Sequence, residues 1–394
     1  MMVNRQNRNK VLFGTGRLGP YPMHRFKRVD RPTNLITDNI QRIDYREHAI
    51  NRAFRGDFGT AVQAAAPHVE NQYPLTAAQV DVLLSLASLQ DNEVANSKAP
   101  IPDDPAILSR HIKRLGYFLK ADIMGICRVP QGAMYSHNKL GQPIDTDYKY
   151  AIVIVMGKEY QTVKASTGSD WILASISFQC YQHLAFVSRT IADYIRRLGH
   201  PAVACHTFQL PEGYRALMPP LLLWAGIGEV SRSGIILNPY LGPCFKAAAV
   251  LTDLPLMSDK PIDFGLQDFC QDCKICAQAC PVQAISMGDK VMYNGYETWK
   301  LDAGRCVSWF MGNKYGTGCG VCQGVCPWTR PTTWPHNFVR WTVRHSALAR
   351  KLAIKVDNIR GRAKPGHEKK EDKWWFDVHG LEGGLRSAPT KEQR

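Results

Sequence analysis

The most regular pattern of hydrophobic positions in this chain lies between residues 176 and 198. Apolar side chains recur there at spacings of four and three residues, at Ile176, Cys180, Leu184, Val187, Ile191, Ile195 and Leu198. This period places them on one face of an α-helix, so we predict a long helix with a buried face. Gly199 follows directly, and glycine commonly ends helices.

Shorter apolar runs predict the strands of a sheet. Residues 150–156 are rich in β-branched side chains and predict a buried strand, and residues 121–126 and 202–205 predict two more. Residues 234–238 and 245–251 flank a turn-forming segment with two prolines and a glycine, so we expect them to form a hairpin.

Two further segments predict helices before and after these strands. One covers residues 105–115, with Asp104 as its N-terminal cap and an end near Gly116. The other covers residues 217–227 and is interrupted early by Pro219 and Pro220.

The alternation of strands and helices, ending in the expected hairpin, indicates an α+β or α/β core, and we predict α+β as the fold class. Its first hundred residues are polar and mixed, without strong periodicity. Near the other end, Trp374-Trp375-Phe376 is an aromatic patch that we expect to pack back on the body. The segments that we expect are an N-terminal segment packing on the core (1–104), the core (105–260), a cysteine-rich domain (261–335) and a basic C-terminal tail (336–394).

Composition and charge restrict the function only loosely. The 394 residues are 45% hydrophobic, an ordinary share for a globular protein, and no apolar stretch is long enough to span a bilayer. The net charge of +15 suits an acidic electron-transfer partner, an anionic substrate or a plain solvated surface, whereas the sequence has no recognisable nucleic-acid module. The first residues lack an export signal, so we expect a cytoplasmic protein without a membrane partner.

Eight of the twelve cysteines fall into two ferredoxin-like runs. The first is Cys270-x2-Cys273-x2-Cys276-x3-Cys280 and the second is Cys306-x12-Cys319-x2-Cys322-x3-Cys326, each followed by proline. In two-cluster ferredoxins the cysteine before the proline ligates the other cluster. We therefore predict two 4Fe-4S clusters, one held by Cys270, Cys273, Cys276 and Cys326, and the other by Cys280, Cys306, Cys319 and Cys322.

Zinc knuckles or disulfides are the alternatives for these eight cysteines. Zinc sites favour two C-x2-C pairs per metal and rarely repeat C-x3-C-P, so the pattern favours iron–sulfur clusters and electron transfer. The remaining cysteines lie among apolar residues and are expected to be buried, namely Cys127, Cys180, Cys205 and Cys244.

The cysteine-rich region resembles the cluster signature of two enzyme families. The stretches DFCQDCKICAQACPVQAI (268–285) and GVCQGVCPW (320–328) look like the signature shared by reductive dehalogenases and epoxyqueuosine reductases. The resemblance also covers residues 234–256, and Arg55-Gly56-Asp57-Phe58-Gly59 is similar to an N-terminal element of the dehalogenases. In total it spans roughly residues 40–335.

This resemblance implies a nitroreductase-like core that binds cobalamin, followed by a ferredoxin-like domain with two 4Fe-4S clusters. It also implies a base-off corrinoid without a histidine ligand. The sequence agrees at Asp377-Val378-His379, because Glu382 stands where the Asp-x-His-x-x-Gly cobalamin motif has its glycine.

The resemblance also implies a proton donor, Tyr181, which lies on the predicted long helix 89 residues before Cys270. A phenol with a pKa near 10 is a weak acid, so a nearby cation must stabilise the phenolate. Lys246 is the candidate, although Cys244 occupies one of two positions that are often basic in the family; Arg305 is the second choice. The plain alternative for Tyr181 is a core tyrosine with a satisfied hydroxyl.

Two further groups of residues follow from the resemblance. Trp309 and Tyr315, in the loop between the first two cysteines of the second run, are expected to line the substrate pocket; packing around a cluster is the alternative. Gly234, Asn238 and Gly242 are expected to flank the corrinoid, although each also has a plain turn explanation.

The function expected from the resemblance is that of a reductive dehalogenase removing halide from a small organohalide. The chain has no fused reductase module, so an external low-potential ferredoxin or flavodoxin is the expected electron donor. The alternatives are an epoxyqueuosine reductase acting on tRNA, which the positive charge would suit, and a ferredoxin-like subunit without catalysis, for which so large a core would be unnecessary.

Overall fold

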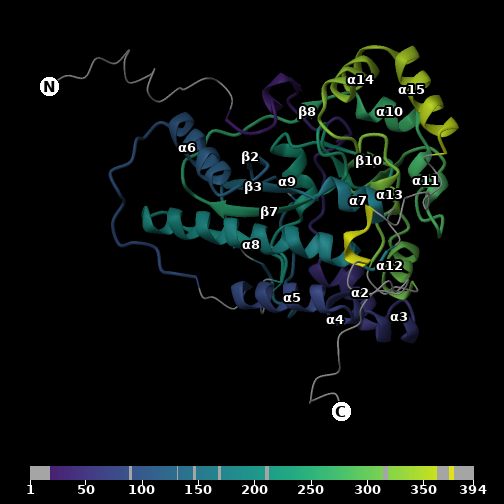
Figure 1. The fold of residues 1–394 in the computed structure, drawn as a ribbon. Helices are drawn as coiled ribbons and strands as arrows, with labels where there is room; N and C mark the ends of the chain where they lie inside the picture. The colour runs from purple at the N-terminus through teal and green to yellow at the C-terminus, as the bar shows by residue number, and fades with distance from the viewer. Residues whose placement is uncertain are drawn as a thin grey trace.

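A four-stranded antiparallel sheet lies at the centre of the core (Figure 1). The computed structural model describes residues 18–87, 91–130, 132–144, 148–166, 170–208, 213–313, 318–361 and 372–376. The strands run in the order β2-β3-β7-β4, with bounds Ile123–Arg128 (β2), Tyr150–Gly157 (β3), Phe245–Thr252 (β7) and Ala202–Cys205 (β4). Alternate side chains of β3 point to opposite faces, and both faces are covered, so the whole strand is apolar.

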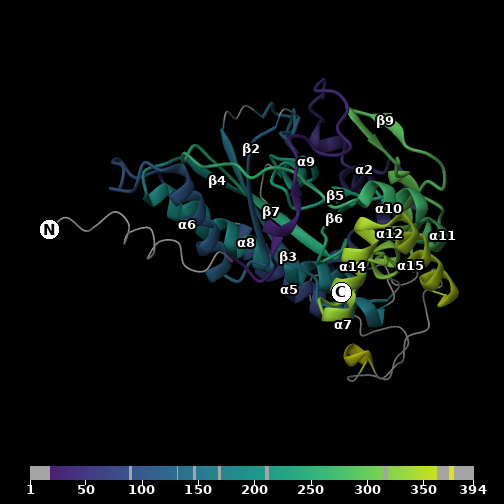
Figure 2. The same cartoon turned by 90° about the horizontal axis from the view of Figure 1, so that it is seen from above.

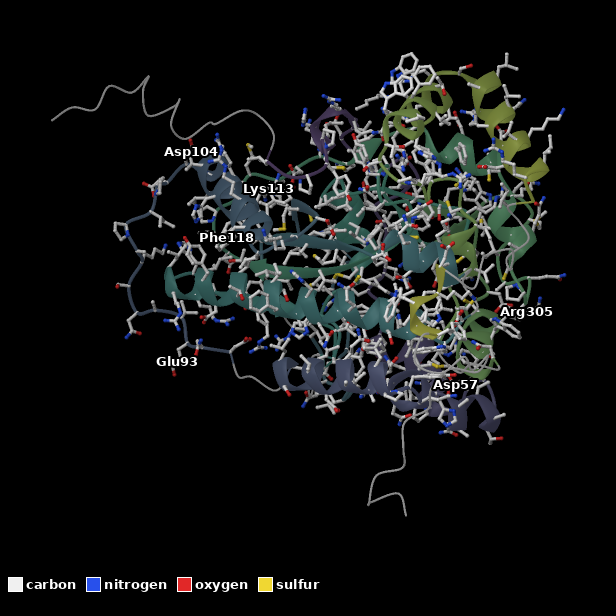
Figure 3. The ribbon with its side chains drawn as sticks, viewed as in Figure 1. Asp57, Glu93, Asp104, Lys113, Phe118 and Arg305 are labelled. Carbon is white, nitrogen blue, oxygen red and sulfur yellow. The ribbon has the colours of Figure 1, made fainter. Side chains whose placement is uncertain are left out.

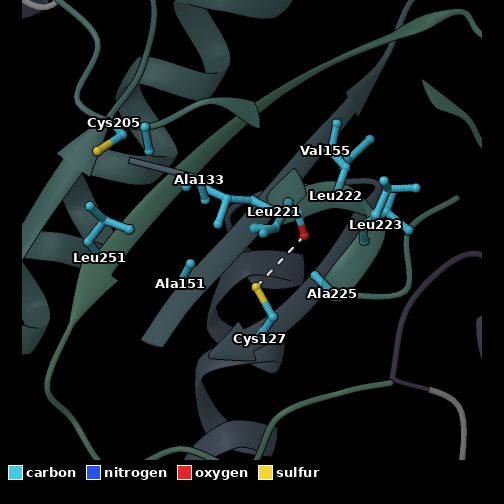
Figure 4. Packing of buried hydrophobic residues seen from close by; sticks show 14 of the residues in the cluster. Cys127, Ala133, Ala151, Val155, Cys205, Leu221, Leu222, Leu223, Ala225 and Leu251 are labelled. Atoms are coloured by element: carbon cyan, nitrogen blue, oxygen red, sulfur yellow. Dashed lines mark hydrogen bonds between the residues drawn. The ribbon is translucent and has the colours of Figure 1, made fainter. Parts of the chain in front are cut away.

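Helices cover both faces of this sheet (Figure 2). On one face, α6 (Pro105–Phe118) and α8 (Leu173–Arg197) pack against side chains such as Ile152 and Ile154. On the other face lies α9 (Met218–Trp224), where the Cys127 thiol donates a 3.8 Å hydrogen bond to the Leu221 carbonyl (Figure 4). The mixed helix and sheet architecture expected from the sequence is confirmed.

The predicted long helix is confirmed as α8. Its buried stripe includes Cys180, Leu184 and Ile191, and Gly199 follows the helix with a left-handed φ of 83°. The predicted strands correspond to β2, β3 and β4, within two residues at their ends. Asp104 caps α6 by accepting a hydrogen bond from the Ala106 amide, but the helix continues through Gly116 to Phe118.

The predicted hairpin of residues 234–238 and 245–251 is wrong. The first segment contributes β6 (Ile236–Leu237), which pairs with β5 (Glu229–Val230), whereas the second is β7 of the central sheet. Asn238 closes a tight turn to Gly242, and the chain then leaves in a new direction toward β3. A turn does form between Asn238 and Gly242, as expected, but turn-forming residues do not specify which strands pair on either side.

Four helices in the first hundred residues were not predicted. Their side chains pack against α8 and against the cysteine-rich region, in a cluster that includes Ala53, Leu83 and Phe178. Their short length and mixed composition leave little periodicity to detect, so tertiary packing determines them. They are α2 (Ala49–Arg55), α3 (Thr60–Ala65), α4 (His68–Asn71) and α5 (Pro74–Ala87).

The cysteine-rich region and the segment after it are mainly helical. Here α14 (Trp334–His345) and α15 (Ala347–Ile359) form a pair that packs on the core around Cys270. The remaining helices are α10 (Leu266–Asp272), α11 (Ile275–Ala279), α12 (Ala303–Gly312) and α13 (Val321–Gly324). Two small antiparallel pairs complete this part, β9 (Val291–Tyr293) with β10 (Tyr296–Thr298) and β1 (Lys27–Arg28) with β8 (Ile262–Asp263).

The aromatic patch near the C-terminus packs on the body, as expected. A short 3-10 helix (Trp374–Phe376) buries Trp375, whose indole donates a 3.1 Å hydrogen bond to Asp170. The Lys373 ammonium lies 2.8 Å from the other oxygen of Asp170. Short 3-10 turns also form nearer the start of the chain, at Met23–Arg25 and at Tyr45–Glu47.

Among the described residues, no helix combines the length and the apolar character needed to cross a bilayer. The boundaries between the four segments drawn from the sequence stay a prediction.

Candidate functional site

The eight cysteines of the two runs form two neighbouring sets of thiols. Cys326 interacts electrostatically with Cys270, Cys273 and Cys276, although it lies in the other run. In the same way, Cys306 interacts with Cys319 and with Cys280. These neighbours are the ones that the crossed arrangement requires; the assignment of each thiol as a ligand stays a prediction.

Burial raises the pKa of these thiols, and the neighbouring sulfurs add to the effect. The pKa of Cys276 is raised to about 12, and those of Cys273 and Cys306 to about 11. A thiolate there needs a positive partner, which the iron ions of a cluster would supply, so the residues fit 4Fe-4S clusters. Among the described residues, no three His, Cys, Asp or Glu side chains are arranged to hold a single metal ion.

A buried arginine, Arg232, braces the first thiol set and was missed by the sequence analysis. Its guanidinium donates to the backbone carbonyls of Cys270, Gln271, Ser286 and Gly288, at 2.9 to 3.3 Å. Its Cζ atom also lies 4.6 Å from the ring centroid of Trp299. The positive charge opposes the rise in the pKa of the thiols at Cys270, Cys273 and Cys276. No sequence motif marks such a residue.

The structure brings Tyr181 and Lys246 together. Tyr181 lies on α8, beside Cys180, whose thiol donates a 3.6 Å hydrogen bond to the Gly157 carbonyl at the end of β3. Lys246 lies on β7 opposite Met156, so the register of the sheet carries it to the same place. Its ammonium is 4.8 Å from the centroid of the Tyr181 ring. A cation over a phenol face is a favourable electrostatic contact.

A second lysine, Lys158, also faces Tyr181 and was not identified from the sequence. It follows β3 directly, and its ammonium donates a 2.9 Å hydrogen bond to the Gln323 side chain. Burial raises the pKa of Tyr181 to about 12, and the charge of Lys158 opposes that rise. Burial and then the charge of Lys246 lower the pKa of Lys158 to about 8. The only signal in the sequence was a lysine directly after a fully apolar strand.

Hydroxyl groups line the other side of Tyr181. The Thr207 hydroxyl is hydrogen bonded to the Tyr214 hydroxyl, and Thr207 also forms a side-chain hydrogen bond with Tyr181. Burial raises the pKa of Tyr214 well above its ordinary value. Next to Thr207, the Nε2 atom of His206 is buried and has no hydrogen-bond partner in the described part of the chain. The hydroxyls of Thr207 and Tyr214 thus give the Tyr181 site a polar edge.

The residues around Trp309 form a helix, α12, rather than the loop expected. Trp309 therefore lies against Cys319, to whose thiol its side chain is hydrogen bonded. Adjacent positions on a helix point about 100° apart. It is Phe310 and Met311 that pack in the same cluster of side chains as Tyr181. Tyr315 lies outside the described residues.

Arg305, the second choice for a cation beside Tyr181, is placed elsewhere. Figure 3 shows it near the molecular surface on α12, on the same side of the molecule as Asp57. Its side chain is 64% exposed and forms an ion pair of 3.3 Å with Asp302. The described contacts of Arg305 therefore give it no part in the Tyr181 site.

The N-terminal element at residues 55–59 packs near the same place. Phe58 belongs to the cluster of apolar side chains around Tyr181, and the Cζ atom of Arg52 lies 4.9 Å from its ring centroid. Asp57 accepts hydrogen bonds from Arg52 and Arg55, which hold the pKa of its carboxyl below the ordinary value. This ionic turn fixes Phe58 against α12.

The turn with Gly234, Asn238 and Gly242 joins the core to the cysteine-rich region. Asn238 is fully buried, and its side chain accepts from the amides of Tyr240 and Leu241 and donates to the Ile227 carbonyl. Gly242 has a φ of 60°, and a Cβ atom there would lie 2.9 Å from the Trp328 carbonyl oxygen. Gly234 also has a left-handed φ, of 76°. The fold alone thus explains why each of these residues stands at its position, and a role in corrinoid binding stays a prediction.

The cysteine-rich region and the fold have counterparts among known proteins. Residues 269–329 match the family of 4Fe-4S dicluster domains. The structure is similar to that of a catabolic reductive dehalogenase, with a TM-score of 0.85 and 35% identity, over 95% of this chain and 54% of that one. That dehalogenase has also been solved in complex with 3-bromo-4-hydroxybenzoic acid.

Sequence relatives give the same result. The tetrachloroethene reductive dehalogenase of Sulfurospirillum multivorans is 26% identical over 67% of this chain and 58% of its own length. The epoxyqueuosine reductase of Leadbetterella byssophila is 31% identical over 26% of this chain and 34% of its own.

The fold and the dicluster region define an iron–sulfur protein. The chain is a relative of the reductive dehalogenases, with a more distant likeness to epoxyqueuosine reductases, so the resemblance predicted from the sequence is confirmed. It spans about half the length of the dehalogenases that it matches.

Proposed function

We propose that this protein is a cobalamin-dependent reductive dehalogenase that removes halide from a small organohalide. The observation that carries the proposal is the pairing of Tyr181 with Lys246 at 4.8 Å, in a core that also holds two sets of four thiols. A subunit that only transfers electrons would have no use for a buried phenol beside a cation. The likeness to a catabolic reductive dehalogenase along nearly the whole chain supports the same function.

The reaction takes two electrons and one proton: the carbon–halogen bond breaks, halide leaves, and a carbon–hydrogen bond forms. A bound corrinoid would supply the low-potential cobalt chemistry at the halogen. Tyr181 supplies the proton from its hydroxyl oxygen, and Lys246 stabilises the phenolate that remains. The apolar surroundings that raise the pKa of Tyr181 to about 12 keep the phenol protonated at neutral pH, ready to donate.

The remaining site residues take supporting parts in this proposal. The eight cysteines hold two 4Fe-4S clusters, which pass electrons one at a time toward the Tyr181 site. Gly234, Asn238 and Gly242 shape the wall beside a base-off corrinoid through their backbone, because the Asn238 amide is used inside the protein. Trp309 contributes aromatic surface beside the second cluster, and Tyr315 remains a candidate for the substrate pocket.

The relatives and the charge of the chain guide the choice of substrate and electron donor for this proposal. The relatives include a tetrachloroethene dehalogenase and an enzyme solved with a brominated hydroxybenzoic acid, so both chemistries are candidates. The net charge of +15 suits a small acidic ferredoxin or flavodoxin as electron donor, because opposite charges steer association. Binding of such a donor weakens as salt screens the charges.

The test is anaerobic reconstitution with iron, sulfide and cobalamin, followed by a halide-release assay. Tetrachloroethene and 3-bromo-4-hydroxybenzoic acid are the first substrates, with a chemically reduced low-potential dye as donor. Binding of an epoxyqueuosine-modified tRNA stem loop is measured in parallel. Halide release above that of free cobalamin supports the proposal. Tight binding and reduction of the modified tRNA, with no halide from a wider organohalide panel, would overturn it.

A further inference from the structure

Lys158 lies between the Tyr181 site and the thiol sets. Its backbone amide donates a 2.9 Å hydrogen bond to the Cys244 carbonyl, which anchors the chain directly after β3. Its ammonium donates a 2.9 Å hydrogen bond to the Oε1 atom of Gln323. Gln323 lies on α13, directly after Cys322, so a single side chain connects the two regions.

Gln323 is itself held firmly. Its backbone carbonyl oxygen accepts a 2.5 Å hydrogen bond from the Thr329 hydroxyl and a 3.7 Å one from the Cys244 thiol. The Cys244 thiol and the Thr329 hydroxyl are also 3.4 Å apart. These bonds fix the backbone of Gln323, from which its side chain reaches the Lys158 ammonium.

We infer that Lys158 is a positioning residue for Tyr181: its ammonium faces the phenol and is held by Gln323, the residue that follows the candidate cluster ligand Cys322 on α13. Lys246 contacts the ring face of Tyr181, so the two lysines act on the phenol from different elements, β7 and the segment after β3. This inference rests on the proposed function for its catalytic consequence.

The charges around Tyr181 decide how Lys158 acts. The phenol is faced by titratable groups from its own helix, from β7, from the segment after β3 and from the loop after β4, namely Cys180, Lys246, Lys158 and Tyr214. Burial raises the pKa of Tyr181, and among these groups Lys158 lowers it. A protonated Lys158 therefore makes the phenol a stronger acid and stabilises the phenolate left after proton transfer.

The pH dependence has a definite sign. The pKa of Lys158 is lowered to about 8, so its charge is present at pH 7 and is lost as the pH rises past 8. Tyr181 stays protonated over that range, because its own pKa is raised to about 12. We therefore expect dehalogenation by the parent protein to fall above pH 8 while its phenol is still protonated.

The first test compares Lys158→Met and Lys158→Arg in the reconstituted holoprotein, with Lys164→Met as control. Lys164 is an exposed lysine on the helix that follows, α7 (Tyr160–Ser166). Losing a neighbouring charge shifts a pKa by about one unit or more, so Lys158→Met should lower kcat about tenfold or more and flatten the profile near pH 8. Lys158→Arg keeps its charge, so it should retain most of kcat and move the fall to higher pH. A fall that stays at pH 8 in Lys158→Arg would assign it to Lys246 and overturn the inference.

The second test does not need dehalogenase activity. Removing a positive charge near an iron–sulfur cluster makes its reduction less favourable. Lys158→Met should therefore lower the midpoint potential of one cluster more than that of the other in an EPR-monitored redox titration, and Lys164→Met should shift neither. Equal potentials in the parent and in Lys158→Met would overturn the inference. If the parent released no halide, the proposed function would fail, and this titration would still decide the place of Lys158.

Discussion

The thiol sets and the Tyr181 site are built in opposite ways. The candidate cluster ligands come from a stretch of 57 residues, 270 to 326, in which short helices present neighbouring cysteines. The Tyr181 site draws single residues from α8, from β7 and from the segment after β3, which only the folded sheet brings together. Ligands that lie close together in the sequence can be recognised from their spacing. The position of a buried acid beside its cations depends instead on long-range packing.

The two regions also handle charge differently. The cation beside the first thiol set, Arg232, is fully committed to backbone carbonyls, and its place is structural as well as electrostatic. The cations beside Tyr181 are lysines with lowered pKa values, whose charge can be lost. A guanidinium stays charged at any working pH, but a buried ammonium does not. Changes in pH should therefore act on the Tyr181 site before they act on the thiol sets.

The largest effect is expected from Cys276→Ser. Serine is a poor ligand for iron, so this variant should lose one cluster, and the iron content should fall from about eight to about four per chain. Cys180→Ser is the matched control for iron content, because the buried Cys180 thiol donates to the Gly157 carbonyl and belongs to neither run of candidate ligands. Iron and sulfide analysis of reconstituted protein makes the measurement. Unchanged iron in Cys276→Ser would show that the spacing had been misinterpreted.

Tyr181→Phe should leave both clusters intact and slow the chemistry. It removes only the hydroxyl, and a general acid typically contributes about a hundred- to ten-thousand-fold. We expect halide release to fall by that factor while cobalt and iron contents stay at the parent level. Tyr194→Phe on the same helix is the control, because Tyr194 is hydrogen bonded to His111 away from the site. A parent-like rate in Tyr181→Phe would mean that water supplies the proton.

Lys246→Met should have a smaller effect than Tyr181→Phe. The methionine keeps most of the length of the lysine stem and removes the charge above the Tyr181 ring, which is worth up to about 2 kcal/mol when desolvated. A loss of about tenfold in kcat with little change in KM is expected, measured by steady-state halide release. A variant that changed KM alone would place Lys246 in substrate binding instead.

The smallest effect is expected at Glu229, where the core meets the cysteine-rich region. Its carboxyl group is buried, accepts from the Thr33 hydroxyl and from the Phe264 amide, and has a pKa raised to about 7, chiefly by burial. The folded protein keeps this proton up to about pH 7, while the unfolded chain loses it above about pH 4.3. Stability should therefore fall as the pH rises from about 4.3 to 7 and then level off.

Glu229→Gln should remove that dependence, because glutamine cannot ionise. Melting temperatures recorded from pH 5 to 8 should decline by a few degrees in the parent and stay flatter in the variant. Glu297→Gln, at an exposed position, is the control. Parallel curves for the parent and Glu229→Gln would show that Glu229 is ionised in the folded protein.

Local patterns predicted much of this molecule and failed at identifiable places. The helix period around Leu184 and the apolar run of residues 150–156 predicted α8 and β3, because burial of one element decides its own pattern. The strand pairing predicted for residues 234–238 was wrong, because turn-forming residues carry no information on which strands pair. Among the site residues, Lys246 was placed beside Tyr181 by the resemblance, and the sheet register explains why it lies there.

The site residues that were not predicted carry no recognisable signal in the sequence around them. Lys158 and Arg232 matter because of what surrounds them, and a single sequence does not show those neighbours. The loop expected around Trp309 is a helix, in which Phe310 packs in the cluster around Tyr181 and Trp309 lies against Cys319; a part for Trp309 in the substrate pocket stays a prediction. The spacing of residues along the chain identifies ligands that are close in sequence. It does not identify groups that come together from separate helices and strands.

The contact of the C-terminal segment with Asp170 has a practical consequence for protein engineering. Cutting the chain before Lys373 would remove both the ammonium and the Trp375 indole from a carboxylate that lies in the interior. Breaking a buried ion pair by removing one partner typically costs about 3 to 5 kcal/mol. A trimmed fragment would then behave as a folding defect and could be mistaken for an inactive enzyme. Deletions should stop beyond Phe376, and affinity tags should be attached beyond it as well.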